Sequence, residues 1–159
     1  MKFSTQEEYG LRCLLRIARE GGEKGLTIPE IAQAEGLTMP NAAKLLRIMR
    51  LGGLLDSARG QVGGYSLSKP PEQIPISDVL NVLGGRLYDK EFCSVHAGVP
   101  DICTNSIDCS LRSLWQMVQN AVDGVLTKIT LKDLISAASQ QAGVTKIGTY
   151  DKDYIDISN

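Results

Sequence analysis

Histidine, tryptophan and phenylalanine are scarce in this sequence of 159 residues, which contains one, one and two of them respectively. The single histidine, His96, has no triad context, and one histidine cannot supply the paired ligands of an HExxH motif. Neither a GxxxxGKS/T phosphate loop nor a GxGxxG motif opening a helix is present. We therefore expect a protein that is not an enzyme.

Long hydrophobic runs and a secretory signal are also lacking. No run of about 18 apolar residues is available to span a membrane, and the N-terminal MKFSTQEEYG has neither the apolar core nor the cleavage site of a signal. Hydrophobic residues make up 43% and charged residues 22% of the chain, as in a globular protein. We expect a cytoplasmic protein with no membrane partner, folded as one compact domain or a small domain with an appended element.

A large excess of one charge is absent, because the net charge is only −1. This argues against a protein that coats nucleic acid with its whole surface. The average hides a division, since residues 37–69 contain five basic residues and one acidic residue, whereas residues 70–159 contain seven basic and eleven acidic residues. The first of these segments is suited to an anionic partner.

Three helices are predicted in the first third of the chain. Leucines and alanines at spacings of three and four residues predict an amphipathic helix over residues 6–20. A capping-box pattern begins a second helix at Thr27, which ends near Gly36, and Thr38 caps a third helix that continues to about Leu51. Two helices joined by a short glycine-containing turn are typical of a helix-turn-helix, although an ordinary helical hairpin has the same pattern.

A β-hairpin is predicted directly after the third helix. Residues 54–58 and 64–68 favour short strands around the turn RGQVG, and a hairpin in this place is the wing of a winged helix. The expected fold class is mainly α with a small β-hairpin wing, forming a winged helix-turn-helix domain over residues 1–70. Its candidate DNA-binding residues are Thr38, Pro40, Asn41, Lys44, Arg47, Arg50, Arg59, Gly60 and Tyr65. Arg59, at the wing tip, is suited to enter a minor groove.

A long helix with an apolar seam is predicted from about residue 110. Its seam residues alternate spacings of four and three: Leu111, Trp115, Val118, Val122, Val125 and Ile129. A core helix has the same stripe, but helix-turn-helix proteins usually bind DNA as dimers, and a second copy of the helix would cover it. We expect a short helix over 76–83 and a dimerisation helix over about 110–127 within a segment 71–138. A further helix, capped by Thr130 with Asp133 in its first turn, should continue to about Ala138, followed by a flexible tail over 139–159.

Three of the four cysteines and the only histidine lie in one segment, CSVHAGVPDICTNSIDC: Cys93, His96, Cys103 and Cys109. Such thiols could form a disulfide, hold a metal or an iron-sulfur cluster, carry out redox chemistry or be buried. Structural disulfides are rare in the reducing cytoplasm, which favours metal binding or redox chemistry. Cys13 lies among leucines in the first helix and is expected to be a small buried apolar side chain.

The order and spacing of these motifs resemble the Rrf2 family of winged-helix repressors and sensors, typified by IscR and NsrR. The resemblance covers residues 1–138. It is carried by MKFSTQEEYGLRCLLRIA, by LTIPEIAQAEGLTMPNAAKLLRIMRLGGLL, by the wing RGQVGGYSL, by ISDVLNVLGG, and by CSLRSLW followed by LTKITLKDLI. It implies a homodimeric transcriptional regulator, expected to be a repressor, that binds a double-stranded DNA operator and dimerises through the helix after the third loop cysteine.

The resemblance also implies an iron-sulfur cluster, either 2Fe-2S or 4Fe-4S, that senses nitric oxide, redox state or iron supply. Its ligands would lie in a loop over about residues 86–109 and would be Cys93, Cys103 and Cys109. Some members use a histidine three residues after the last cysteine, but Arg112 stands there and cannot bind iron. Other members use a carboxylate of the first helix, from either subunit, and the matching residue is Glu8, with Glu7 and His96 as weaker candidates.

Three other readings of the cysteine segment stay open. Zinc would accept three thiolates with Glu8 or His96, although zinc sites usually contain closely spaced cysteine pairs. A cluster-free regulator would use the thiols themselves as its sensor. A small iron-sulfur or thiol enzyme is the remote alternative, because it leaves the basic helix and wing without a function.

Overall fold

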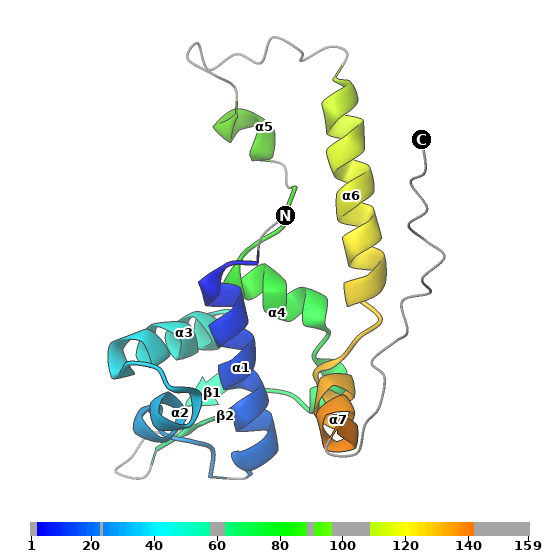
Figure 1. Ribbon diagram of the computed structural model, residues 1–159. Helices are drawn as coiled ribbons and strands as arrows, with labels where there is room; N and C mark the ends of the chain where they lie inside the picture. Colours follow the sequence, from blue (N-terminus) through cyan, green and yellow to red (C-terminus); the bar gives the residue numbers. More distant parts are fainter. Residues whose placement is uncertain (1–2, 23, 58–62, 89–90, 97–108, 142–159) are drawn as a thin grey trace.

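The computed structural model describes residues 3–22, 24–57, 63–88, 91–96 and 109–141, with side chains described to residue 137. The elements follow in the order α1 (Thr5–Glu20), α2 (Ile28–Glu35), α3 (Met39–Leu51), β1 (Leu55–Ser57), β2 (Tyr65–Leu67), η1 (Pro71–Gln73), α4 (Ile76–Leu83), α5 (Phe92–Val95), α6 (Ser110–Leu126) and α7 (Leu131–Gln141). Helices α1 to α4 and the hairpin pack together, while α6 stands beside them with α7 below it (Figure 1). This confirms a mainly α fold with a small β-hairpin wing.

Side-chain caps fix where the first helices begin. Thr27 accepts a hydrogen bond from the backbone of Glu30, whose carboxylate accepts one from the backbone of Thr27, so the predicted capping box is present. α1 has a second capping box, from Ser4 and Glu7, so this helix begins one residue before the start predicted at residue 6. Gly36 ends α2 with φ of 65°, a left-handed conformation that glycine adopts without strain.

One hydrophobic core joins the winged helix to later parts of the chain. Its buried side chains include Leu14 of α1, Leu46 of α3, Val79 of α4 and Leu131 at the start of α7. Backbone hydrogen bonds link the chain before α4 to the chain before α7, from Ile76 to the carbonyl of Ile129 at 2.9 Å and from Leu131 to Ile74 at 2.9 Å. The division of the chain at residue 70 stays a prediction.

The wing is extended by a neighbouring segment. β1 and β2 are antiparallel, with Leu55 opposite Leu67, and Leu26 bridges to Tyr65 on the other side of β2 through two backbone hydrogen bonds. Gly25 is required here, because its φ is +68° and a Cβ atom would lie 2.5 Å from the Tyr65 carbonyl oxygen. The wing is thereby attached to the chain that leads into α2.

The second half of the chain contains one element that was not predicted. α5 is a single short helix within the segment expected to be an irregular loop, and it carries Cys93. α6 and α7 match the two helices expected there, and Thr130 with Asp133 forms the cap of α7. The predicted flexible tail after residue 141 lies outside the described residues. Among the helices described, none is both long and apolar enough to cross a membrane.

Candidate DNA-binding surface and cysteine site

Helix α3 has one buried face and one basic face. The buried residues are Ala42, Leu45, Leu46 and Met49. Lys44, Arg47 and Arg50 follow one another at spacings of three residues and are exposed, so their charged groups share the solvent side of the helix. The packing of α3 on the core therefore presents a row of cations suited to DNA phosphates.

The N-terminal end of α3 offers the remaining predicted contacts of this helix. Thr38 and Pro40 are exposed, Asn41 is half-buried, and the Thr38 side chain makes no capping hydrogen bond. In helix-turn-helix proteins the first residues of the second helix contact base edges, and the positive end of the helix dipole favours phosphate. Thr38, Pro40 and Asn41 therefore stay candidate DNA contacts.

Of the predicted DNA-binding residues in the wing, the structure describes Tyr65. Tyr65 is half-buried, packs on the core and pairs with Leu26, so its backbone is committed to the sheet. Arg59 and Gly60 lie outside the described residues.

Ion pairs hold α2, the first helix of the helix-turn-helix, against α1. The Glu35 carboxylate, whose side chain is 8% exposed, accepts hydrogen bonds from Arg12 Nε at 3.0 Å and Arg16 Nε at 2.8 Å. Arg12 also donates to the Glu35 backbone carbonyl at 2.9 Å, which satisfies a free carbonyl at the end of α2. The hydrogen bonds to Glu35 and Glu20 raise the pKa of the Arg16 guanidinium.

Two of the three loop cysteines are described, and both are free and half-buried. Cys93 lies in α5, and Cys109 is the residue that precedes α6. The Tyr88 hydroxyl lies 3.9 Å from Cys93 Sγ. Partial burial, the contact with Cys93 and the nearby Cys109 raise the pKa of the Tyr88 phenol, against the opposing effect of Arg112, so the phenol keeps its proton. Cys103 lies outside the described residues.

The candidates for a fourth ligand have different surroundings. Glu8 is exposed in the first turn of α1, while the Glu7 carboxylate accepts the Ser4 backbone N–H at 2.6 Å in the capping box. The His96 ring stacks on Phe92 with centroids 4.2 Å apart, and its Nδ1 lies 2.7 Å from the Phe92 carbonyl oxygen. The described residues of one protomer bring together no group of three side chains able to hold a metal ion.

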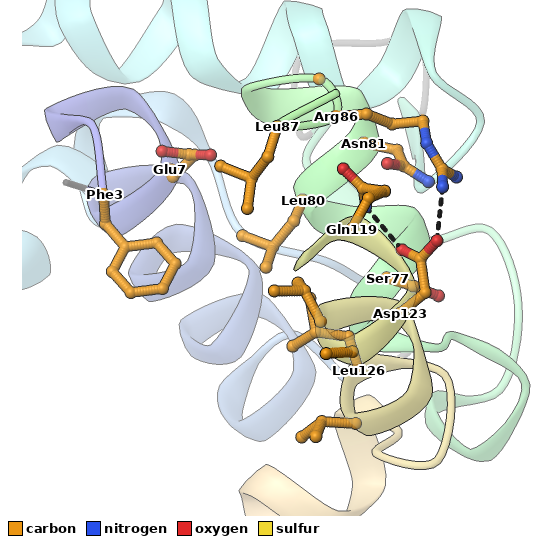
Figure 2. A pocket seen from close by; sticks show the side chains of 14 residues that line it. Phe3, Glu7, Ser77, Leu80, Asn81, Arg86, Leu87, Gln119, Asp123 and Leu126 are labelled. Carbon is orange, nitrogen blue, oxygen red and sulfur yellow. Dashed lines mark hydrogen bonds and ion pairs between the residues drawn. The ribbon is translucent and has the colours of Figure 1, made fainter. Parts of the chain in front are cut away.

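A pocket of about 350 Å³ lies between the start of α1, α4 and α6 (Figure 2). Leu80, Leu87 and Leu126 form apolar walls, and Gln119 and Asp123 reach into it from α6. It is therefore placed between the winged helix and the helix that follows the cysteine segment.

Helix α6 exposes a long apolar face. Its large exposed hydrophobic residues are Leu111, Leu114, Trp115, Met117 and Val125, which are between 41% and 63% exposed. Part of the predicted seam thus faces solvent in a single protomer, and an apolar surface of this kind marks an interaction site.

A helix-turn-helix with a basic second helix, followed by a β-hairpin wing, defines a winged-helix DNA-binding protein. The chain belongs to the Rrf2 family, described as an iron-dependent transcriptional regulator, which matches residues 3–137. This confirms the family resemblance seen in the motifs. The chain is a DNA-binding transcriptional regulator and not an enzyme.

Individual relatives cover nearly the same length. The protein rrf2 of Nitratidesulfovibrio vulgaris is 34% identical over 139 residues, 87% of this chain and 90% of the relative. The structure of CymR, the global cysteine regulator of Bacillus subtilis, is 32% identical with a TM-score of 0.67, over 86% of this chain and 98% of that one. IscR of T. potens is 30% identical with a TM-score of 0.68, over 92% and 93%.

Three residues that shape these sites were not identified from the sequence. Glu35 gave no signal beyond its charge, although Arg12 and Arg16 are one helical turn apart and share a face of α1. Tyr88 and Gln119 lie 31 residues apart, and their contact depends on how the chain folds back along α6. For Gln119, the one available signal was a glutamine placed between apolar seam positions.

Proposed function

We propose that this chain is a homodimeric transcriptional repressor whose affinity for a double-stranded DNA operator is controlled by an iron-sulfur cluster. The observation that carries the proposal is the placement of Cys93 and Cys109. Both are free thiols beside α6, which also carries the apolar face suited to a second copy. The proposal places the protein in the cytoplasm, where its operator lies.

The donor set suits a cluster that responds to its surroundings. Cys93, Cys103 and Cys109 would supply soft thiolates, which iron-sulfur clusters prefer, and Glu8 a harder and more weakly held carboxylate. When bound, the cluster supplies a centre that nitric oxide, redox change or iron shortage can alter. Members of the family that use a carboxylate of the first helix take it from either subunit, so Glu8 of either copy of the chain is the proposed fourth ligand.

The N-terminus of α1 could carry the signal to the DNA-binding surface. Two residues before Glu8, the Gln6 side chain donates to the carbonyl of Leu83 at the end of α4. α1 also packs on α3 through the core, so a displacement of Glu8 would be transmitted to α3, the helix with the basic face. A coupling of about 1–3 kcal/mol would change DNA affinity about 5- to 150-fold.

A cluster-free thiol regulator is the second candidate. It is favoured by the similarity to CymR, which is described as a cysteine regulator. In such a regulator the thiols of Cys93 and Cys109 would themselves be oxidised in response to the signal. A regulator with a zinc ion bound to the same thiols is a variant of this candidate.

Anaerobic purification tests the proposal directly. We expect a brown protein with iron and sulfide in equal amounts, and cluster-dependent binding to DNA selected from a random pool. Glu8→Ala should lose the wild-type absorption spectrum and that dependence, whereas Glu20→Ala, at the exposed end of the same helix, should keep both. A colourless wild-type protein that still binds DNA would favour the thiol or zinc candidate, and an unchanged Glu8→Ala protein would exclude Glu8 as a ligand.

A further inference from the structure

The one buried residue of α6 is a glutamine. Gln119 is 3% exposed, on a helix whose large apolar residues mostly face solvent. Polar side chains in buried positions are costly unless they are hydrogen-bonded, so a polar residue at this position needs an explanation.

Both ends of the Gln119 amide are satisfied. Its Oε1 accepts the Tyr88 backbone N–H at 3.0 Å, and its Nε2 donates to Asp123 Oδ1 at 2.8 Å. The other Asp123 oxygen accepts a hydrogen bond from Arg86, as Figure 2 shows. The segment 86–88 is therefore held to α6 at two residues, Gln119 and Asp123, which lie one helical turn apart on that helix.

The held segment leads directly to Cys93. Tyr88, whose N–H binds Gln119, places its hydroxyl 3.9 Å from Cys93 Sγ. Phe92, next to Cys93, packs against the rings of Tyr88 and Trp115 with centroid distances of 5.3 and 6.2 Å. Cys93 is thus located relative to α6 by these contacts, and Cys109 is located by preceding the first residue of the same helix.

We propose that Gln119 is a positioning residue for the cysteine site: by fixing the register of segment 86–88 on α6, it sets where Cys93 lies relative to Cys109. This inference deepens the proposed function and rests on it. An apolar side chain at position 119 would fill the space but would leave the Tyr88 N–H without its acceptor. Directional hydrogen bonds specify one arrangement of two packed segments, which hydrophobic contact alone does not.

Variants of α6 separate positioning from simple burial. Gln119→Leu removes both hydrogen bonds, and Gln119→Glu keeps an acceptor for Tyr88. Gln116→Leu is the matched control, since Gln116 is exposed one turn earlier and bonds only to Asn120 on its own helix. All are prepared as full-length, metal-free protein and compared by circular dichroism.

Two rates measure the position of the segment without a cluster. In Gln119→Leu we expect the Tyr88 amide to exchange its hydrogen about fivefold faster, and Cys93 to be alkylated by iodoacetamide faster by a similar factor. In Gln119→Glu, which keeps the acceptor for Tyr88 but brings a carboxylate against that of Asp123, the exchange should accelerate less than in Gln119→Leu, and Gln116→Leu should leave both rates unchanged. If Gln119→Leu does not fold, Asp123→Asn replaces it and should accelerate alkylation at least about twofold, because the Arg86 pair loses its charge.

Cluster reconstitution then links these rates to the site. Gln119→Leu should take up less iron and sulfide than wild type, while Gln116→Leu takes up the same amount. Wild-type exchange and alkylation rates in Gln119→Leu, or in Asp123→Asn where that variant replaces it, would overturn the positioning role. A wild-type protein that takes up no cluster would instead overturn the proposed function, and the two rates on metal-free protein would still decide the role of Gln119.

Discussion

The backbone N–H of Leu131 donates to the carbonyl of Ile74 at 2.9 Å, and the Leu131 side chain is fully buried in the core that α1, α3 and α4 share. Leu131 is the first residue of α7, so the chain returns to the winged helix immediately after leaving α6. α6 is consequently attached at both ends, to the cysteine segment at its start and to the DNA-binding body at its end. A shift of α6 in response to the cysteine site would therefore reach the winged helix.

Leu131→Ala should destabilise the whole N-terminal body. Removing a buried leucine side chain loses its burial and leaves a cavity, which costs about 3 kcal/mol. Urea unfolding, followed by circular dichroism at one fixed protein concentration, measures the free energy of unfolding. Leu51→Ala is the control, because Leu51 is 69% exposed at the end of α3 and should change that free energy by less than about 0.5 kcal/mol. Equal effects of the two substitutions would contradict the anchoring of α7 in the core.

Most of the fold was predictable from local patterns in the sequence. Thr27, Glu30 and Gly36 define the ends of α2 through chemistry that involves only neighbouring residues, and the structure contains the expected cap and left-handed glycine. α6 was predicted in the same way from the spacing of its apolar residues.

Contacts between distant residues were not predictable in this way. α5 is too short to show a periodic pattern, and the Ser4 capping box lies before residue 6, where the apolar spacing predicts the start of the first helix. The pairing of Tyr88 with Gln119 follows from the path of the chain between them. For the candidate site, the sequence identified the residue types, while the structure showed which of the described residues lie together.

The basic face of α3 predicts how salt should affect DNA binding. Because phosphate contacts release counterions, the logarithm of affinity should fall linearly with the logarithm of salt concentration. Arg47→Ala should reduce that slope by about one unit in a monomer and by about two in a dimer, where each contact occurs twice. Lys132→Ala, an exposed cation on α7, is the control and should leave the slope unchanged. Fluorescence anisotropy with a random-sequence duplex measures the slope, and an unaltered slope for Lys44→Ala, Arg47→Ala and Arg50→Ala alike would contradict the assigned surface.

Cys13 should contribute to stability in a manner that depends on pH. Its side chain is completely buried, and burial raises the pKa of the thiol from 9.0 to about 11. Because the pKa of Cys13 is higher in the folded state than in the unfolded state, its contribution to the free energy of unfolding is fully present below pH 9. That contribution is lost as pH rises toward 11. At pH 10, one unit above the unfolded-state pKa, the free energy of unfolding should have fallen by about 1.4 kcal/mol, since one pKa unit corresponds to 1.36 kcal/mol.

The comparison with Cys13→Ala isolates this titration from others. Under anaerobic reducing conditions, the stability advantage of wild type over Cys13→Ala should shrink by that amount between pH 7 and pH 10. Iodoacetamide should also label Cys93 and Cys109 in the native metal-free protein while sparing Cys13 until the protein unfolds. A constant difference between the two proteins across this pH range, or early labelling of Cys13, would show that this thiol is accessible.

The apolar face of α6 predicts a dimer that one substitution should separate. Val125 is 53% exposed on this face, and Trp115, the only tryptophan of the chain, is 41% exposed on the same helix. Val125→Arg would bring two like charges into the contact between subunits, so the dissociation constant should rise at least about 100-fold, equivalent to about 2.7 kcal/mol. Sedimentation equilibrium measures that constant, and Trp115 emission should move to longer wavelength as the dimer separates. Asn120→Arg, on the opposite side of α6 from the seam, should leave both measurements as in wild type, and a Val125→Arg protein that remains dimeric would mean that the subunits meet through another surface.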